Sequence, residues 1–344
     1  MDHIQGIRHN AVSAWFEANV AGATLPLTFE LIAGGHSNLT FKATDARGRR
    51  YVLRRPPLYQ VLATAHDMGR EHKVIAALEN TDVPVPRAFG LCEDETVNER
   101  PFYVMEFVEG RVVRRPQEAA GLSPKKRRFA SLSVADTLAL IHAVDVDEAG
   151  LGDLGKKEDY IARQLRRWMR QFDESKTQER TEIQAVHDHL AARIPDQGPA
   201  GIVHGDYRLD NCILDARGRI SAVLDWELCT LGDRNADVAQ LLVYWAEPED
   251  PEFALDNPPT GVPGFATREE MKDRYQEASG RDLDHFEFYL AFASWKVACI
   301  LEGVYSRYVS GAMGDKAPPQ GVESFAARVD ALTHMAAAAA EQVA

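Results

Sequence analysis

The pattern of apolar and polar positions changes near residue 120. Before that point, short alternating runs predict strands at residues 27–35, 37–44 and 49–55, with glycine-containing turns between them. A longer repeat at residues 8–20 predicts an amphipathic helix in front of these strands. Because tight glycine turns join neighbouring antiparallel strands, we expect a small antiparallel sheet.

Three more elements are predicted before residue 120. A helix begins near Ala65, a proline-bounded loop and edge strand occupy residues 83–90, and a buried strand occupies residues 102–110. Proline is tolerated at a sheet edge because an edge strand leaves some of its N–H groups unpaired. The first part of the chain is therefore expected to be a sheet that carries few helices.

Past residue 120 the apolar residues recur at helical spacing. One core-facing stripe consists of Leu132, Ala135, Leu138, Ala139 and His142. Further helices are predicted at residues 156–174, 178–195 and 286–311. The chain is thus expected to be an α+β protein whose larger, second part is mostly helical.

Composition places the chain among globular proteins, with 344 residues, 45% hydrophobic and 26% charged. The net charge of −13 argues against nucleic acid as a partner. No apolar run reaches the roughly 20 residues of a membrane span, and the first ten residues lack a signal-peptide core, so we expect a cytoplasmic protein with no membrane partner. Four scattered cysteines indicate neither disulfides nor zinc, and the oligomeric state stays open.

The segment HGDYRLDNCILDARGRISAVLDWE, residues 204–227, holds the most specific chemistry. Asn211 follows Asp206 by five residues, and Asp225 ends the second of two short strands joined by a turn at residues 216–219. Such a hairpin would bring Asp225 beside Asn211. Phosphoryl transfer needs a base for the attacking hydroxyl and hard oxygen ligands for Mg²⁺. Asp206 is the candidate base, and Asn211 and Asp225 are the candidate metal ligands.

A simpler reading is a polar turn, because Asp and Asn favour turns through local hydrogen bonds. That reading does not explain the His-Gly-Asp opening together with both spacings. The chain also lacks the P-loop, Rossmann, serine-hydrolase and zinc-protease motifs. Phosphoryl transfer is therefore the favoured interpretation.

These strings resemble the catalytic and metal-binding loops of the aminoglycoside phosphotransferase and choline kinase group, with HGD and DWE in place of the protein-kinase His-Arg-Asp and Asp-Phe-Gly. Over residues 25–310 the chain resembles the kinase domain fused to some acyl-CoA dehydrogenases, through LRRPP, LDWELCTLGD and LEGVYSRY. The resemblance implies a two-lobed protein-kinase-like fold, with a sheet lobe at residues 1–108 and a helical lobe at residues 109–344.

The resemblance also implies ATP as the cofactor, held under a loop formed by Gly34, Gly35, Ser37 and Asn38. Glycine lets backbone amides approach phosphates closely, and the serine adds a donor. Taken alone, a Gly-Gly pair more often marks an ordinary hairpin. The elements that follow give the pair its meaning.

Kinases hold the nucleotide phosphates with a strand lysine that is paired to a helix glutamate. By resemblance, Arg54 takes the lysine position and Glu71 the glutamate position, although a surface ion pair of little energetic value would look the same in sequence. The strand at residues 102–110 resembles the linker between kinase lobes. The carbonyl of Glu106 and the amide of Val108 are then the candidate adenine contacts.

Three further residues surround the predicted catalytic loop. His204 is expected to brace it, and Arg208 matches a lysine that approaches the transferred phosphate in protein kinases. Asp237 matches an acid that turns inward to brace the loop, or else it is a first-turn acid that the helix dipole favours. Only about a dozen residues separate Asp225 from Asp237, which leaves no room for a protein-kinase activation segment and favours a small-molecule acceptor.

The acceptor is expected to meet the C-terminal helices. The polar members of residues 286–311 are candidate pocket residues: Trp295, Lys296, Glu302, Tyr305 and Arg307. The acidic segment at residues 246–259 would attract an amine. A predicted helix rich in arginine would attract an anion, although such a helix face is more often simply exposed to solvent. Its arginines are Arg163, Arg166, Arg167 and Arg170.

The predicted function is an ATP- and Mg²⁺-dependent kinase acting on a small-molecule hydroxyl, with a hydroxyacyl-CoA or hydroxy acid as the acceptor that the resemblance favours. An aminoglycoside or choline-type kinase is the first alternative. A nucleotide-binding pseudokinase with a regulatory role is the alternative from another class.

Overall fold

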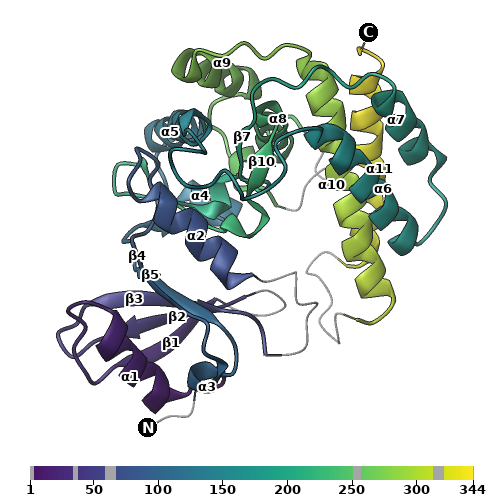
Figure 1. The fold of residues 1–344 in the computed structure, drawn as a ribbon. Coiled ribbons are helices and arrows are strands. Elements are labelled where there is room, and N and C mark those ends of the chain that lie inside the picture. Colours follow the sequence, from purple (N-terminus) through teal and green to yellow (C-terminus); the bar gives the residue numbers. More distant parts are fainter. Residues whose placement is uncertain (1–3, 34–37, 59–66, 251–256, 313–320, 344) are drawn as a thin grey trace.

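The fold was analysed in a computed structural model that describes residues 4–33, 38–58, 67–250, 257–312 and 321–343. Two lobes lie one beside the other (Figure 1). The first is built on an antiparallel sheet with strand order β1-β2-β3-β5-β4. Its elements are α1 (His9–Asn19), β1 (Thr28–Ala33), β2 (Leu39–Thr44), β3 (Arg50–Arg55), α2 (Met68–Leu78), β4 (Ala88–Cys92), α3 (Glu95–Asn98) and β5 (Phe102–Glu106).

The predicted strands and the edge position of β4 are confirmed. Residue Ala65 lies outside the described residues, and the described helix α2 begins at Met68 after the N-cap Asp67, whose side chain accepts a hydrogen bond from the Arg70 amide. The last sheet strand, β5, ends at Glu106, and the next strand pairs with β8 of the second lobe.

The second lobe is mostly helical and contains short strands in a two-stranded sheet, β10-β7, and a three-stranded sheet, β6-β8-β9. Its strands and 3₁₀ turns are β6 (Arg111–Val112), β7 (Gly201–Val203), η1 (Leu209–Asn211), β8 (Cys212–Leu214), β9 (Ile220–Val223), η2 (Trp226–Leu228), β10 (Thr230–Gly232) and η3 (Pro259–Gly261). Its helices are α4 (Pro116–Ala120), α5 (Pro124–Ala143), α6 (Tyr160–Ser175), α7 (Thr181–Ala191), α8 (Arg234–Tyr244), α9 (Arg268–Ser279), α10 (Phe286–Val309) and α11 (Glu323–Ala340).

Alternation along β3 divides its side chains between two hydrophobic cores. Tyr51 and Leu53 belong to the core under α1, whereas Val52 belongs to the larger core that runs through α2 into the helical lobe. Arg54 therefore lies on the same face as Val52 and is directed toward the second lobe. Arg55 lies on the opposite face, where its guanidinium donates to the Gly6 carbonyl at 2.6 Å.

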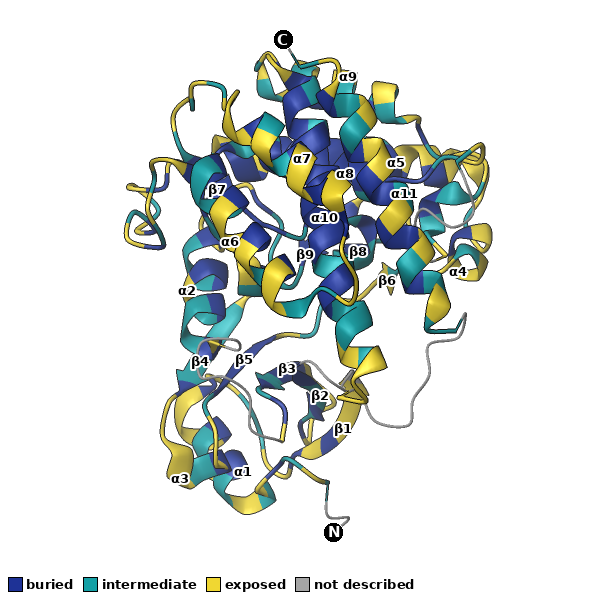
Figure 2. Cartoon of the chain, turned by 90° about the vertical axis from the view of Figure 1, so that its right-hand side faces the viewer, coloured by how far each residue is buried: buried dark blue, intermediate teal, exposed yellow. Residues whose placement is uncertain are grey.

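Helix α10 runs through the most buried part of the helical lobe (Figure 2). By length and composition alone it could cross a membrane, but 72% of its most apolar window is buried against the rest of the protein. A helix that is apolar on all sides is typical of a core position in a large lobe. Its neighbours α8 and α11 pack directly against it.

Asp45 closes the turn between β2 and β3, and its carboxylate accepts hydrogen bonds from the amides of Arg47 and Arg49, both at 2.9 Å. Burial raises the pKa of Asp45, but these hydrogen bonds and that of Thr24 outweigh it and lower the pKa to about 2. Because this value lies below that of the unfolded chain, the stabilisation is present above about pH 4 and is lost as the pH falls toward 2.

Asp45→Asn is therefore expected to lower the free energy of unfolding by about 1 to 2 kcal/mol near neutral pH. Urea unfolding of both proteins, followed at pH 7 and then at decreasing pH, measures the difference. The deficit of the variant should shrink as the pH approaches the pKa of Asp45. A deficit that is equal at all pH values would show that the carboxylate charge contributes nothing.

Candidate active site

The predicted catalytic loop between β7 and β8 is shaped by a glycine and an asparagine. Gly205 has φ +83°, and a Cβ there would lie 3.0 Å from the Leu228 carbonyl oxygen, so the turn requires glycine. The Asn211 side-chain amide donates to the Asp206 carboxylate at 3.0 Å and to its backbone carbonyl at 2.9 Å. The amide oxygen of Asn211 is thereby turned away from Asp206. Burial raises the pKa of Asp206, and the nearby Arg208 opposes this effect.

The hairpin of β8 and β9 brings Asp225 back to Asn211, as the spacing predicted. The amide of Leu224 donates to the Asn211 carbonyl at 2.8 Å. Asp225 itself has φ +66°, in the left-handed region that residues other than glycine seldom occupy. Such conformations are concentrated at functional sites, where the surrounding structure holds them in place.

His204 joins these two segments and is completely buried. Its Nδ1 accepts from the Asp206 amide at 3.3 Å, and its Nε2 lies 3.0 Å from the Leu224 carbonyl oxygen. An imidazole that accepts at one nitrogen and donates at the other is neutral. His204 thus braces the loop, as predicted, and has no spare nitrogen for proton transfer.

Asp237 also braces the loop, from the first turn of α8. Its carboxylate accepts from the amides of His204 at 2.5 Å and Gly205 at 2.9 Å. Burial would raise the pKa of Asp237, but hydrogen bonding to the loop and to the nearby His142 lowers it overall. Of the two readings of this acid, the inward-facing one is confirmed, and its position in the first turn of the helix is compatible with it.

Arg54 links the two lobes. Its guanidinium lies 3.1 Å from the Glu71 carboxylate on α2 and 2.6 Å from that of Asp225 in the second lobe. Glu71 is almost fully buried, and burial raises its pKa to about 7 against the opposing effect of Arg54. The Arg54–Glu71 pair is therefore a buried ion pair. The alternative interpretation of the sequence, an ion pair on the surface, is wrong.

Glu227 belongs to this site, although the sequence analysis did not select it. It accepts from the Asn38 side-chain amide at 3.2 Å and lies 3.8 Å from Arg54. Burial, followed by the charge of Asp225, raises its pKa to about 7. Glu227 is the third residue of the DWE string, where protein kinases have glycine. This replacement of glycine by glutamate is the feature of the sequence that could have indicated its role. The predicted phosphate-loop residues Gly34, Gly35 and Ser37 lie outside the described residues.

The site carries more negative than positive charge. Five carboxyl groups gather around the guanidinium groups of Arg54 and Arg208. They belong to Glu71, Asp206, Asp210, Asp225 and Glu227. Such an excess favours a cation when an anionic nucleotide binds.

Asn211 and Asp225 fit Mg²⁺, because they offer an amide oxygen and a carboxylate on adjacent backbone segments. Among the residues that the structure describes, no group of three or more His, Cys, Asp or Glu side chains is arranged to hold a metal. Mg²⁺ needs only one or two protein carboxylates when phosphates and water complete its shell. The donor set therefore suits a nucleotide-bound ion and not a structural metal.

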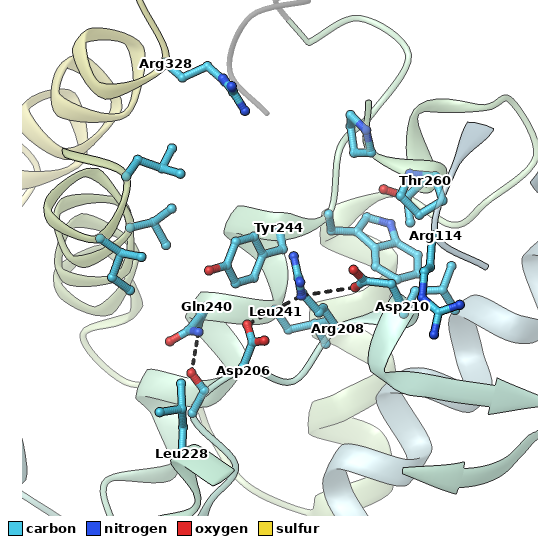
Figure 3. A pocket seen from close by; sticks show the side chains of 18 residues that line it. Arg114, Asp206, Arg208, Asp210, Leu228, Gln240, Leu241, Tyr244, Thr260 and Arg328 are labelled. Atoms are coloured by element: carbon cyan, nitrogen blue, oxygen red, sulfur yellow. Dashed lines mark hydrogen bonds and ion pairs between the residues drawn. The ribbon is translucent and has the colours of Figure 1, made fainter. Parts of the chain in front are cut away.

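Arg208 lies beside Asp206 and Asp210. Its Nε is 3.1 Å from Asp210 and 3.5 Å from Asp206, and its guanidinium stacks over the Tyr244 ring (Figure 3). The two carboxylates fix a side chain that would otherwise be mobile. Arg208 is therefore held next to the Asp206 carboxylate. Its positive charge would lie close to any group that binds beside Asp206.

A pocket of about 370 Å³ opens beside Asp206 (Figure 3). One wall is apolar and comes from α8, α10 and η2, and three arginines contribute positive charge. The apolar residues are Leu228, Leu241, Val297, Ile300 and Leu301, and the arginines are Arg114, Arg208 and Arg328. Sequence spacing offered no signal for Arg114 or Arg328, which reach the pocket from distant elements.

The expectation that the five polar candidates of α10 line this pocket is wrong, because none of them is among its lining residues. Trp295 donates to the Ile183 carbonyl, Lys296 to Gln240, and Glu302 accepts from Thr177, all in buried positions. Apolar residues of α10 line the pocket instead. Tyr305 and Arg307 are also absent from its lining, and Arg307 is exposed.

The arginine-rich helix is α6. Three of its arginines, Arg166, Arg167 and Arg170, are exposed to solvent, as expected for a solvated helix face.

Glu106 and Val108 lie at the end of β5 and just after it, on the connection between the lobes. The Glu106 side chain is exposed and Val108 is partly exposed. The adenine contacts assigned to these two residues stay a prediction.

Comparison with known proteins agrees with this geometry. A family model described as the phosphotransferase enzyme family matches residues 28–258. A probable acyl-CoA dehydrogenase IBR3 of Arabidopsis thaliana is 34% identical over 340 residues, which cover 92% of this chain and 41% of that protein. The chain therefore spans less than half the length of this relative.

Two solved structures share the fold. A Ralstonia eutropha protein with a provisional aminoglycoside phosphotransferase name is 34% identical with a TM-score of 0.81, over 97% of this chain and 98% of that one. Aminoglycoside phosphotransferase APH(4)-Ia, solved with AMP-PNP and hygromycin B, is 18% identical with a TM-score of 0.60, over 95% and 99%. The predicted two-lobed kinase-like fold and the family resemblance are confirmed.

Proposed function

This chain belongs to the phosphotransferase enzyme family, and from that premise we propose that it moves the γ-phosphate of ATP to a hydroxyl group of a small molecule in the presence of Mg²⁺. The observation that carries the proposal is the group formed by Asp206, Asn211 and Asp225, of which Asp206 lines a pocket. Arg54 reaches the same group from the other lobe at 2.6 Å. Phosphoryl transfer needs these parts in this arrangement.

Each residue then has a defined task. The Asp206 carboxylate accepts the proton of the acceptor hydroxyl while the hydroxyl oxygen bonds to the γ-phosphorus and the bond to the leaving ADP oxygen breaks. Arg54, held by Glu71, orients the phosphates. Mg²⁺, held by Asn211 and Asp225, would supply positive charge on the phosphate oxygens. Arg208 lies close enough to Asp206 to offset charge on the transferred group.

The pocket favours an acceptor that combines an aliphatic part with an anionic group. Apart from the proposed base, its charged lining consists of three arginines and Asp210, and the wall opposite is apolar. A hydroxy acid or a hydroxyacyl-CoA has this composition. The name of the Arabidopsis relative also points to acyl-CoA compounds. Both observations support a hydroxyacyl acceptor over an antibiotic.

An amine acceptor, as in an aminoglycoside or choline-type kinase, would need uncompensated acids near the pocket. In the acidic segment that raised this alternative, Glu247 and Asp250 form ion pairs with Arg268, and residues 251–256 lie outside the described residues. The pseudokinase alternative is disfavoured because Asp206, Asn211 and Asp225 are present and adjacent. A protein without catalytic activity has no need to keep all three together.

The acceptor class is tested by incubating the protein with Mg²⁺·ATP and a panel of hydroxy acids, hydroxyacyl-CoAs, choline, ethanolamine and aminoglycosides. We expect ADP and a phosphomonoester with the anionic hydroxy compounds. Arg114→Met should raise the KM for these acceptors without changing the KM for ATP, because Arg114 lines the acceptor pocket. Turnover confined to the amines would overturn the acceptor assignment but not the phosphotransferase assignment.

A further inference from the structure

Lys296 is a buried lysine in the core of the helical lobe. Only 5% of the residue is exposed, and its ammonium donates to the neutral side-chain oxygen of Gln240 at 2.6 Å. The same ammonium lies 5.9 Å from the Trp168 ring on α6. Burying an ammonium group against a neutral amide is costly, and an apolar side chain of similar volume is usually at least as stable. Stability alone therefore does not explain this lysine.

The contact with Lys296 determines how the Gln240 amide is oriented. A lysine ammonium can only donate, so the Gln240 oxygen must face it and the NH₂ group must face the other way. That NH₂ group donates to the Gly205 carbonyl at 2.6 Å (Figure 3). Gln240 itself is buried and also lines the acceptor pocket.

Helix α8 thereby holds both polar groups of Gly205. Asp237 accepts from the Gly205 amide at 2.9 Å, and Gln240, three residues further along the same helix face, donates to the Gly205 carbonyl. Gly205 immediately precedes Asp206, so the direction of its carbonyl sets where the proposed base points. We call Asp237 and Gln240, which hold Gly205 from both sides, the clamp. Lys296 on α10 does not contact Gly205 itself but donates to Gln240 of this clamp.

We propose that Lys296 is a positioning residue for the catalytic loop, acting through the Gln240 side chain on the Gly205 carbonyl and hence on the direction of Asp206. The proposal rests on the phosphoryl transfer proposed above. Burial lowers the pKa of Lys296 to about 8, and the charges of Asp237 and Asp206 oppose that effect while Arg167 adds to it.

Lys296→Met should lower kcat by about 10- to 100-fold, because a small displacement of a catalytic group is enough for such a loss. The KM for ATP should stay within twofold, since the contacts of Lys296 are with Gln240 and Trp168 and not with Arg54 or Glu71. The melting temperature should be unchanged or higher, because methionine removes a buried charge. Lys296→Arg should recover part of the activity, since it keeps a donor and a charge. Lys272→Met is the matched control, because Lys272 likewise stacks on an aromatic ring, 5.3 Å from that of Phe286, but does not contact Gln240.

Two measurements decide the proposal. Hydrogen exchange of residues 201–209, which does not require turnover, should be faster in Lys296→Met than in the wild type or in Lys272→Met. In a double-mutant cycle, Gln240→Met and Lys296→Met together should cost no more in kcat than the larger single effect, because both act through one hydrogen bond. Unchanged loop exchange, or additive losses in kcat, would overturn the positioning role. A wild-type protein without phosphoryl transfer would instead refute the proposed function, and the exchange result would still test the clamp.

Discussion

Asp206→Asn is expected to lower kcat by about 100- to 10,000-fold, the range for loss of a general base. Asparagine matches aspartate in shape and can still accept the hydrogen bond from Asn211, which is 3.0 Å long in the wild type. The loop should therefore keep its geometry and lose only its proton acceptor. The dissociation constant for Mg²⁺·ATP should change less than about threefold, because Arg54 and Glu71 are untouched. Steady-state kinetics and calorimetric titration with a non-hydrolysable ATP analogue measure the two quantities.

Asp210→Asn is the matched control for this variant. Asp210 lies four residues further along the chain and shares the contact with Arg208, at 3.1 Å, but the Asn211 side-chain amide donates to Asp206 and not to Asp210. Its loss should loosen Arg208 and cost far less than the loss of Asp206. Equal activity losses in the two variants would mean that local charge, and not proton acceptance, determines the rate.

Arg54→Met is expected to weaken Mg²⁺·ATP binding by about 10- to 100-fold, the energetic scale of hydrogen bonds to a charged group. The variant also leaves the buried Glu71 without its cation, which should lower the melting temperature. Arg54→Lys should recover only part of the affinity, because an ammonium cannot replace the planar fork that contacts Glu71 and Asp225 together.

The two consequences of Arg54→Met can be separated. Adding Glu71→Gln removes the stranded carboxylate, so the double variant should regain thermal stability without regaining ATP affinity. Thermal unfolding and calorimetric titration of the three variants make the comparison. If ATP affinity in Arg54→Met equals that of the wild type, the arginine has only a structural role in joining the lobes.

Sequence was sufficient where a local pattern determines the geometry. The hairpin spacing was enough to place Asp225 beside Asn211, and strand alternation directs Arg54 and Arg55 to opposite faces of β3. The family resemblance then supplied Glu71, on an element that the chain reaches only after a long connection.

The acceptor pocket could not be derived in this way, because its wall comes from elements far apart in the sequence. Helix α10 is apolar on nearly every side, so its periodicity does not show which residues face a cavity. Polar residues such as Lys296 and Glu302 were assigned to the pocket, whereas the fold uses them as buried contacts and leaves Ile300 and Leu301 at the pocket wall. Glu227 was missed for another reason, because its role depends on Asn38 and Arg54 in the other lobe.

The proposed function requires this site to transfer the γ-phosphate of ATP by means of Asp206. Phosphorus NMR of wild-type protein with Mg²⁺, ATP and the best hydroxy acceptor follows ADP and phosphomonoester in one sample. We predict one phosphomonoester formed per ADP in the wild type, none when Mg²⁺ is chelated, and at most a trace with Asp206→Asn. Phosphomonoester formation at the wild-type rate by Asp206→Asn, or ADP formed without any phosphomonoester across the acceptor panel, would contradict the account.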